Sequence, residues 1–372
     1  RDYINSAVFP DGSVSYRKIL LKYTLGCPSY GCSDWDYDTH VRAMQKTGEF
    51  DSNLVEDPYF TVDGVDRDSM YIEFDTTWVT FFDSTLKITD SVPADTVYIQ
   101  RFLNAGAPTV ATDSFYAFNT GYFKYYWDTS GTAIDSVFVT GDSLWHQNYH
   151  LSYDVFEIVN RVELARLITP YQTDHYPYSY YFDITDYAPL LRDTLDISLL
   201  FSGWQDGFLA TLDFIFIEGT PPRDPKRVIH LYNGSHQYGV SSNPINSWLE
   251  TKTIDFKGDE SQVAMYFCPT GHGIDGLQGC AEFCEKEYYV MVNGTRRYEQ
   301  LIWREDCGLN PIFTQGGTWL FDRANWCPGL PGDKFRHELT NFVDFNNSNN
   351  IKVDFQAYTT GGGGSTPSYS ID

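Results

Sequence analysis

Basic residues and long apolar runs are scarce in this sequence. Its 372 residues include 26 Lys and Arg against 50 Asp and Glu, which gives a formal net charge of −24. Such a field repels phosphate groups, so the charge argues against a nucleic-acid partner and against an anionic membrane surface. Apolar runs such as residues 263–267 (VAMYF) are far too short to span a bilayer, so no membrane partner is expected.

A convincing helical period is also missing. The best helical candidate, residues 160–167, is weak, and period-two alternation dominates elsewhere, as in Ile19, Leu21, Tyr23 and Leu25. The same alternation recurs in residues 195–201, 212–216, 288–292 and 351–355. Many short strands separated by turn residues are typical of antiparallel sandwiches, so we expect an all-β fold.

Cysteine is present in modest number, and its pattern bears on the compartment. The seven cysteines are Cys27, Cys32, Cys268, Cys280, Cys284, Cys307 and Cys327. Six of them pair by proximity, but six cysteines allow about 15 connectivities, so proximity gives a preference only. A zinc site is the alternative, and it is disfavoured because CxxC is absent and no His lies at a supporting spacing. Disulfides indicate an oxidising compartment, and we expect a secreted, periplasmic or cell-surface protein.

Proline marks the expected domain boundary. Three prolines fall within residues 219–225 (GTPPRDP), where they would interrupt a sheet ladder and stiffen a connection. We therefore expect an N-terminal domain over 1–220 and a C-terminal domain over 221–360. The Gly-rich segment 361–372 (GGGGSTPSYSID) has the composition of a flexible tail. The chain begins at Arg1 without a basic-then-apolar leader, so a signal peptide has been removed or the chain was trimmed.

Four short stretches combine Trp, Cys and carboxylates, namely residues 27–37, 202–206, 271–284 and 322–329. A Trp can stack on the apolar face of a sugar ring, while a neighbouring carboxylate can accept hydroxyl hydrogen bonds or activate a water. Acid–Trp loops are also common in purely structural turns. Three of the four stretches lie close to a proposed disulfide, which favours a rigid, functional arrangement.

Three cysteine-anchored motifs occur in one order along the chain. They read CPxxxC-x-[DE]-W-D at 27–36, GCAE-[FW]-C at 279–284 and DRA-x-WCPG at 322–329. Supporting segments are 167–171 (LITPY), 183–186 (DITD) and 219–221 (GTP). With these motifs the chain resembles the peptide-N-glycosidase F family of secreted bacterial amidases. Residues from about 48 to 152 have no recognised counterpart and are expected to be an insertion in the first domain.

The resemblance implies two adjacent antiparallel jelly-roll β-sandwich domains with the active site at their interface. It implies three disulfides, Cys27–Cys32, Cys280–Cys284 and Cys307–Cys327, which would leave Cys268 free. It also implies the site residues. The catalytic group would comprise Asp36, Glu282 and Arg323, with Arg323 in contact with Asp36 and keeping it ionised. The substrate-binding group would comprise Trp35, Trp204, Ser202, Gly203 and His272.

Two positions depart from the family pattern. Tyr37 stands where the family has Arg, and Ser202 stands where it has Glu beside the innermost sugar. Because Ser is smaller than Glu and Gly203 would leave the neighbouring backbone open, we expect tolerance of α1,3-fucose on that sugar.

The resemblance implies hydrolysis of the amide between an Asn side chain and the first N-acetylglucosamine, with release of the whole glycan. The partner would be an N-linked glycoprotein or glycopeptide, and the protein would be a monomer. No cofactor and no metal are expected, because no His, Cys or carboxylate cluster has ligand spacing. Two alternatives remain: a non-catalytic glycan-binding lectin and an endoglycosidase.

Overall fold

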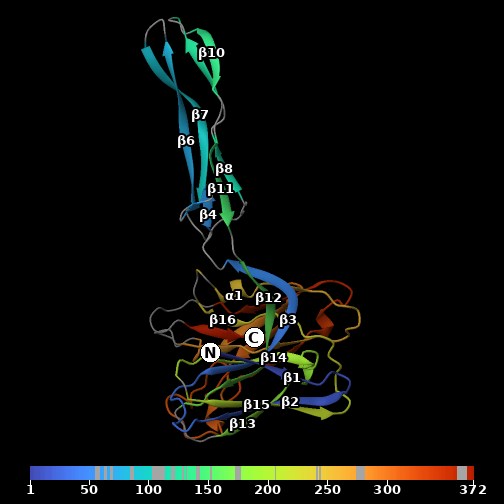
Figure 1. Ribbon diagram of the computed structural model, residues 1–372. Coiled ribbons are helices and arrows are strands. Elements are labelled where there is room, and N and C mark those ends of the chain that lie inside the picture. Colours follow the sequence, from blue (N-terminus) through green and yellow to red (C-terminus); the bar gives the residue numbers. More distant parts are fainter. Residues whose placement is uncertain are drawn as a thin grey trace. The chain divides into compact units, whose positions relative to one another are not determined.

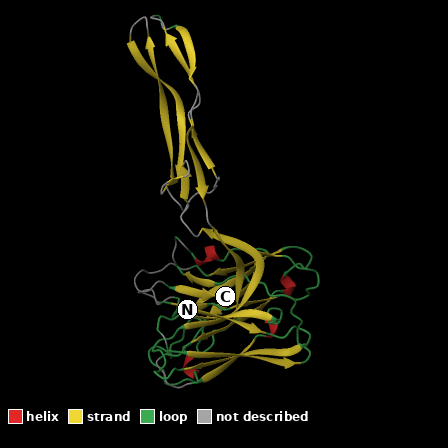
Figure 2. Ribbon diagram, viewed as in Figure 1, coloured by secondary structure: helices red, strands yellow, loops and turns green. Residues whose placement is uncertain are grey.

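The computed structural model describes most of the chain and divides it into two compact units. The described residues are 1–54, 59–62, 65–67, 70–83, 88–102, 114–118, 122–127, 130, 132–139, 143–150, 153–171, 177–205, 207–239, 242, 244–273, 281–357 and 367–372. The first unit comprises residues 1–47 and 159–372, and the second comprises residues 48–158. Strands dominate both units, which confirms the all-β prediction (Figure 2).

The N-terminal half of the first unit is built from two antiparallel sheets, ordered β1-β14-β3-β12 and β13-β2-β15 (Figure 1). The strands are β1 (Asp2–Val8), β2 (Tyr16–Gly26), β3 (Asp38–Leu54), β12 (Tyr153–Ile168), β13 (Tyr178–Asp183), β14 (Thr194–Phe201) and β15 (Leu209–Glu218), with a 3-10 turn η1 (Thr185–Tyr187). Residues 160–167, the weak helical candidate, lie within β12, in agreement with the all-β prediction. Tertiary pairing beside β3 overrides the local pattern there.

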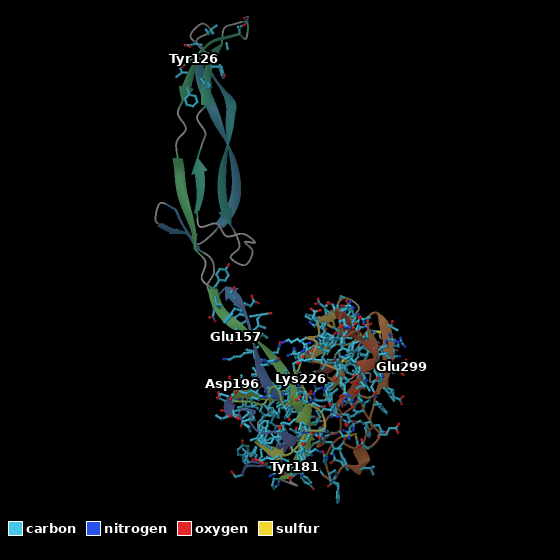
Figure 3. The ribbon with its side chains drawn as sticks, turned by 90° about the vertical axis from the view of Figure 1, so that its right-hand side faces the viewer. Tyr126, Glu157, Tyr181, Asp196, Lys226 and Glu299 are labelled. Atoms are coloured by element: carbon cyan, nitrogen blue, oxygen red, sulfur yellow. A yellow bond between two sulfur atoms is a disulfide. The ribbon has the colours of Figure 1, made fainter. Side chains whose placement is uncertain are left out.

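The predicted alternation on β2 places one face in the core of this half. Ile19, Leu21, Tyr23 and Leu25 are all buried, and they pack in one cluster with residues of β3, β12 and β14. On β13 the same rule buries Tyr180, whereas Tyr181 lies at the surface (Figure 3). Both sheets therefore contribute one apolar face to a shared core, which is the arrangement of a sandwich.

The C-terminal half of the first unit has its own core. Its elements are β16 (Gly234–Gln237), α1 (Ile245–Trp248), β17 (Lys252–Ile254), β18 (Ala264–Phe267), β19 (Thr270–His272), β20 (Lys286–Val292), β21 (Thr295–Ile302), η2 (Cys307–Leu309), β22 (Phe335–Glu338), η3 (Thr340–Phe342), β23 (Asn349–Phe355) and β24 (Ser368–Ile371). The sheets are ordered β16-β24-β19, β17-β23-β20-β21 and β18-β22. Tyr288, Val290 and Val292 alternate into the core, as predicted. Its buried members all lie between residues 232 and 371.

The end of the chain corrects one expectation. The flexible tail was expected to run from 361 to 372, but Ser368–Ile371 form β24 between β16 and β19. Tyr369 and Ile371 are fully buried in the C-terminal core. The glycine run dominates the composition of this segment, but the apolar alternation that follows it is long enough to complete a sheet. Residues 358–366 lie outside the described residues.

The second unit contains long antiparallel hairpins. Its strands are β4 (Tyr59–Val62), β5 (Val65–Arg67), β6 (Met70–Asp83), β7 (Ile88–Phe102), β8 (Ser114–Phe118), β9 (Tyr122–Trp127), β10 (Ala133–Val139) and β11 (Ser143–His150). β6 pairs with β7, β9 pairs with β10, and the third sheet is ordered β5-β4-β11-β8. This unit overlaps the segment expected to be an insertion, about residues 48–152. The insertion itself, and the division at residue 220, remain predictions.

Candidate active site

Asp36 lies on a short segment that is fixed from both sides. A disulfide between Cys27 and Cys32, with Cα atoms 4.6 Å apart, closes the loop that precedes it. On the other side the backbone N–H of Tyr37 donates to the hydroxyl of Thr169 over 2.8 Å, and the N–H of Thr169 donates to the carbonyl of Tyr37 over 2.9 Å. β3 begins at Asp38, so Asp36 stands at the entry to this strand with little freedom to move.

Arg323 is the cation of the site, and it is fully buried. Its Nη1 lies 3.0 Å from Oε1 of Glu282 and 3.8 Å from Oδ2 of Asp36. Nη2 donates to the carbonyl and hydroxyl of Thr318, and Nε donates to the carbonyl of Phe321 over 3.2 Å. A buried guanidinium requires such partners, because an unpaired charge in the interior is strongly destabilising. Arg323 thus lies against Asp36 as predicted, and Glu282, for which no contact with Arg323 was predicted, is the closer acid.

Two aromatic rings complete the environment of Arg323. Its guanidinium lies 4.4 Å from the ring centre of Trp326 and 4.9 Å from that of Phe283. A planar guanidinium stacks favourably on aromatic faces, and the rings exclude water from around it. The orientation of its nitrogens toward the acids is therefore fixed by packing as well as by hydrogen bonds.

Glu282 joins the second and third motifs. Its backbone N–H donates to the carbonyl of Gly273 over 3.3 Å, and its side chain accepts from the N–H of Gly273 over 3.3 Å. Its carbonyl accepts from the N–H of Ala324, which follows Arg323, over 2.8 Å. These bonds bring the acid and the cation together although they are 41 residues apart in sequence.

Burial controls the charge state of both acids. The side chains of Asp36 and Glu282 are 19% and 16% exposed. Burial raises the pKa of Asp36 and the pKa of Glu282, and the positive charge of Arg323 opposes the rise without cancelling it. The expectation that Arg323 keeps Asp36 ionised has the right sign for the effect of Arg323, but it left out the larger, opposing effect of burial.

His272 belongs to the C-terminal half and lies near the same two acids, Asp36 and Glu282. Its Nε2 is 3.1 Å from Oδ2 of Asp38 and 2.9 Å from the hydroxyl of Thr270. The ring stacks on Trp326 with 5.2 Å between ring centres. Its charge contributes to the pKa values of Asp36 and Glu282, which places it within electrostatic reach of both acids. Asp38 was not predicted, although period two places it on the same side of the chain as Asp36.

An exposed aromatic group lies beside the acids. The side chains of Trp35 and Trp204 are 43% and 72% exposed, and their ring centres are 6.2 Å apart. Tyr171 packs edge-on against Trp35 at 5.5 Å, and burial, together with the charges of Asp36 and Asp34, raises the pKa of Tyr171. Tyr171 was also missed as a site residue, although it ends the LITPY segment that supports the family resemblance. Exposed rings of this kind suit the apolar face of a sugar.

Ser202 and Gly203 differ in their surroundings. Ser202 is exposed, and its hydroxyl donates to the carbonyl of Asp38 over 3.0 Å. Gly203, in contrast, does not leave open space: a Cβ there would fall 2.7 Å from the ring of Tyr37 and closer still to Phe201. The expectation of an open backbone at Gly203 was wrong, because two aromatic rings pack directly against its Cα.

The cysteines follow the predicted pairing where they are described. Cys27–Cys32 and Cys307–Cys327 are disulfides, and Cys268 is a buried free thiol. Cys284 is disulfide-bonded, and Cys280, its expected partner, lies outside the described residues. Within the described ranges, no group of three or more His, Cys, Asp or Glu side chains could hold a metal ion. Those ranges also contain no helix that is long and apolar enough to cross a membrane.

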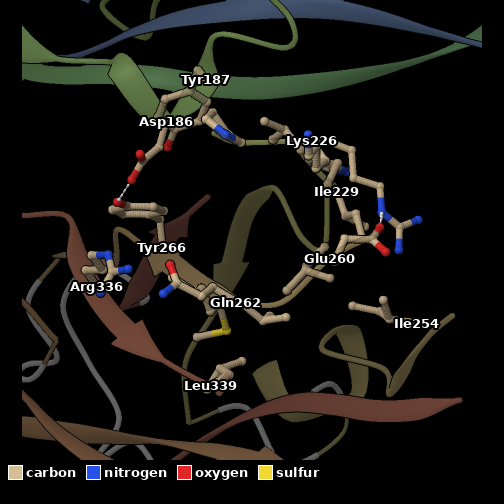
Figure 4. Close-up of a pocket in the computed structure, with 18 of the residues that line it drawn as sticks. Asp186, Tyr187, Lys226, Ile229, Ile254, Glu260, Gln262, Tyr266, Arg336 and Leu339 are labelled. Carbon is tan, nitrogen blue, oxygen red and sulfur yellow. Dashed lines mark hydrogen bonds and ion pairs between the residues drawn. The ribbon is translucent and has the colours of Figure 1, made fainter. Parts of the chain in front are cut away.

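A cavity of about 470 Å³ lies elsewhere in the first unit. It is lined by the connection around Lys226 and by side chains such as Asp186, Tyr187, Tyr266 and Arg336, which surround an open centre (Figure 4). It contains none of the predicted site residues. The acids, Arg323 and the two exposed Trp side chains therefore remain the candidate active site.

Known proteins are similar to this chain in sequence and in fold. Residues 244–369 match the family described as "Peptide-N-glycosidase F, C terminal". A relative from Elizabethkingia miricola, named peptide-N(4)-(N-acetyl-beta-D-glucosaminyl)asparagine amidase F, is 27% identical over 220 residues. The resemblance to the peptide-N-glycosidase F family is confirmed. The match covers 56% of this chain and 62% of the relative, so the chain spans less than two thirds of the relative's length.

Solved structures of the family have the same fold. The crystal structure of an amidase of the same name superimposes with a TM-score of 0.62 at 18% identity, covering 100% of this chain and 87% of the other. A second structure, PNGase F from Flavobacterium meningosepticum, described as a glycosylasparaginase, gives a TM-score of 0.62 at 17% identity with the same coverage. These structures are two β-sandwich domains, as expected here. The jelly-roll strand order of each sandwich remains a prediction.

Proposed function

We propose that this chain is a peptide-N-glycosidase that cleaves the amide between an Asn side chain and the innermost N-acetylglucosamine of an N-linked glycan. The observation that carries the proposal is the buried Arg323 joining Asp36 and Glu282 beside exposed Trp35 and Trp204. The comparisons support an amidase of this family. The substrate would be a glycoprotein or glycopeptide, and the disulfides suit an extracellular or periplasmic site of action.

In the proposed reaction one water is added across the amide. The oxygen of the water bonds to the amide carbon, the bond from carbon to nitrogen breaks, and the nitrogen leaves with the sugar as a glycosylamine. Asp36, the less closely paired acid, activates or orients the water, and Glu282 and Arg323 position the amide and the sugar. The glycosylamine then loses ammonia in water, and Asp remains in the peptide.

The test is incubation with a defined glycopeptide, followed by mass spectrometry of the peptide and of the glycan. The proposal predicts an Asn-to-Asp change together with an intact free glycan. An endoglycosidase would leave one sugar on the Asn, and a lectin would release nothing. Either of these results would overturn the proposal.

We further propose that the enzyme accepts α1,3-fucose on the innermost sugar. Of the two neighbouring residues only Ser202 leaves room for the fucose, since Gly203 is closed in by Tyr37 and Phe201. Ser202 is exposed and short, so a substituent on the sugar's 3-hydroxyl meets no carboxylate there. Relief of a steric clash can change discrimination strongly, because overpacked contacts are steep.

Ser202→Glu tests this second proposal, with Ser13→Glu as the matched control on an exposed loop. We expect Ser202→Glu to slow release from a fucosylated plant-type glycopeptide while release from an unfucosylated one is retained. Ser13→Glu should change neither rate. If the parent leaves the fucosylated glycan attached, or if Ser202→Glu affects both substrates equally, the steric argument is wrong.

A further inference from the structure

Six polar side chains form a closed ring that connects the two halves of the first unit and includes one predicted site residue. In order around the ring they are His272, Asp38, His40, Glu163, Arg166 and Thr270. Asp38 and His40 lie on β3, Glu163 and Arg166 on β12, and Thr270 and His272 on β19. The ring therefore joins strands of the N-terminal sandwich to a strand of the C-terminal half.

The contacts that Glu163 and Arg166 make within the ring are short. Nδ1 of His40 lies 2.6 Å from Oε2 of Glu163, and Oε2 of Glu163 lies 2.9 Å from Nη2 of Arg166. Nη1 of Arg166 donates to the hydroxyl of Thr270 over 2.8 Å and to the carbonyl of Ser370 on β24 over 2.9 Å. Nothing in the proposed reaction requires these buried charges, so they need a separate explanation.

Asp38 is the ring residue next to the active site, and its buried negative charge needs a cation to balance it. Its side chain is 10% exposed, and its Oδ1 is buried with no hydrogen-bond partner among the described residues. Burial alone would raise the pKa of Asp38, but the positive charge and hydrogen bond of His272 hold it well below the usual range. Such a carboxylate is stable inside the protein only when a cation lies against it.

His40 does not supply that cation. Its Nε2 is 4.0 Å from Asp38, whereas its Nδ1 bonds to Glu163. Burial and the nearby charge of Arg166 lower the pKa of His40, so it is neutral at neutral pH. With His40 neutral, the ring holds two anions, Asp38 and Glu163, and two cations, Arg166 and His272. The charges cancel only if His272 is protonated.

His272 is positioned to use this charge. Its ring is held flat against Trp326, whose indole N–H donates to the carbonyl of Gly271 over 2.6 Å. The side chain is still 27% exposed, and the next residue, Gly273, bonds to Glu282. The charged groups that face His272 are Asp38 and Arg166 within the ring, and Glu282 and Asp36 at the active site.

We propose that Asp38 is a positioning residue that holds His272 as an imidazolium at the active site, with the remaining ring residues fixing this pair across the two halves. The inference rests on the proposed function for its catalytic meaning. His272 then acts as a second cation beside Arg323, and it favours the ionised forms of Asp36 and Glu282. Its loss of a proton at alkaline pH should weaken that support.

The experiment compares the parent with Asp38→Asn and with Asp34→Asn. Asp34 and Asp38 both lie two residues from Asp36 in the sequence, but Asp34 is exposed. Asp34→Asn therefore removes the same charge without removing a contact of His272. His272 is titrated by NMR in each protein, and its signal is assigned from its absence in His272→Gln. This readout does not depend on activity, so it tests the inference even if the proposed reaction fails.

We expect the titration midpoint of His272 in the parent to lie above that of an exposed histidine. Asp38→Asn should lower it by about one pH unit or more, and Asp34→Asn should leave it nearly unchanged. The alkaline limb of kcat/KM should move with the His272 midpoint. A merely structural role would reduce the rate at every pH without moving either midpoint.

Two results would overturn the inference. One is a parent midpoint at or below that of an exposed histidine, which can be measured even if Asp38→Asn does not fold. The other is an equal shift in Asp38→Asn and Asp34→Asn. Absence of deglycosylation in the parent, with the expected His272 shift in Asp38→Asn, would count against the proposed function and in favour of the ring.

Discussion

The Nη1 atom of Arg323 lies 3.0 Å from Oε1 of Glu282, whereas its distance from Oδ2 of Asp36 is 3.8 Å. Glu282 is therefore the closer partner of the buried guanidinium, and Asp36, the proposed catalytic acid, is the less closely paired one.

Asp36→Asn should abolish turnover while the fold is retained. The change is isosteric, removes the proposed catalytic charge and leaves the pair of Glu282 and Arg323 intact. Because burial raises the pKa of Asp36, its ionised form is costly in the folded state, so Asn should not lower the unfolding temperature at neutral pH. The measurements are glycopeptide release and thermal unfolding. A rate within tenfold of the parent, about 1.4 kcal/mol in barrier, would count against the assignment.

Glu282→Gln should behave differently, because it removes the closer partner of a buried cation. Burial raises the pKa of Glu282 as it does that of Asp36, so part of the loss is offset, but the buried charge of Arg323 is left without its nearest anion. We therefore expect lower activity together with an unfolding temperature below that of Asp36→Asn. The same two measurements as for Asp36→Asn apply. If Glu282→Gln were as stable as Asp36→Asn, Glu282 would not be the anchor of Arg323.

Activity should fall on mild acidification. Asp36 and Glu282 both have a raised pKa in the folded protein, so each takes up a proton at a higher pH than an exposed carboxyl. Between the unfolded and folded pKa values the native state binds more protons, so these two groups stabilise the fold less as pH rises through that window. A pH–rate profile should show an acid limb above the usual carboxyl range. A limb at the value of an exposed carboxyl would contradict the burial argument.

Gly203→Ala should destabilise the site. Its Cβ would fall 2.7 Å from the ring of Tyr37 and closer to Phe201, and overpacking of this kind costs about 1–3 kcal/mol. Gly26→Ala is the matched control, because the nearest atom to its Cβ would be 3.8 Å away and its φ is ordinary. Thermal unfolding should show a loss for Gly203→Ala only. Equal stability of the two variants would show that the rings can move aside.

Cys268 should resist alkylation in the folded protein. It is buried, and burial raises the pKa of its thiol to about 12, so little thiolate is present at neutral pH. Intact-mass analysis after treatment with iodoacetamide, under native and unfolding conditions, checks this. Rapid native labelling at Cys268, or loss of activity through it without unfolding, would contradict its description as a structural thiol.

The sequence predicts the fold well where apolar residues alternate. The buried run Ile19, Leu21, Tyr23 and Leu25 follows period two, and the cysteine-anchored motifs place Asp36, Glu282 and Arg323 together. What the pattern cannot supply are contacts between distant segments. The crowding around Gly203 comes from Tyr37 and Phe201, and local composition does not reveal it.

The end of the chain and the buried ring illustrate the same limit of local patterns. Four consecutive glycines suggest a flexible tail, yet Tyr369 pairs into a sheet whose other strands begin more than 90 residues earlier. Asp38, Glu163 and Arg166 belong to ordinary strand sequences. Their mutual pairing arises only because β3 and β12 are neighbours in one sheet and meet β19 of the other half.

The most direct test of the central claim is deglycosylation in water labelled with heavy oxygen, with the parent and Asp36→Asn compared on one glycopeptide. Amide hydrolysis at the Asn predicts that the parent gives a sugar-free peptide with Asp at that position, one labelled oxygen in its new carboxylate, and an intact free glycan, while Asp36→Asn gives none of these. A parent product that retains one N-acetylglucosamine on an unlabelled Asn, or no product at all, would contradict the account.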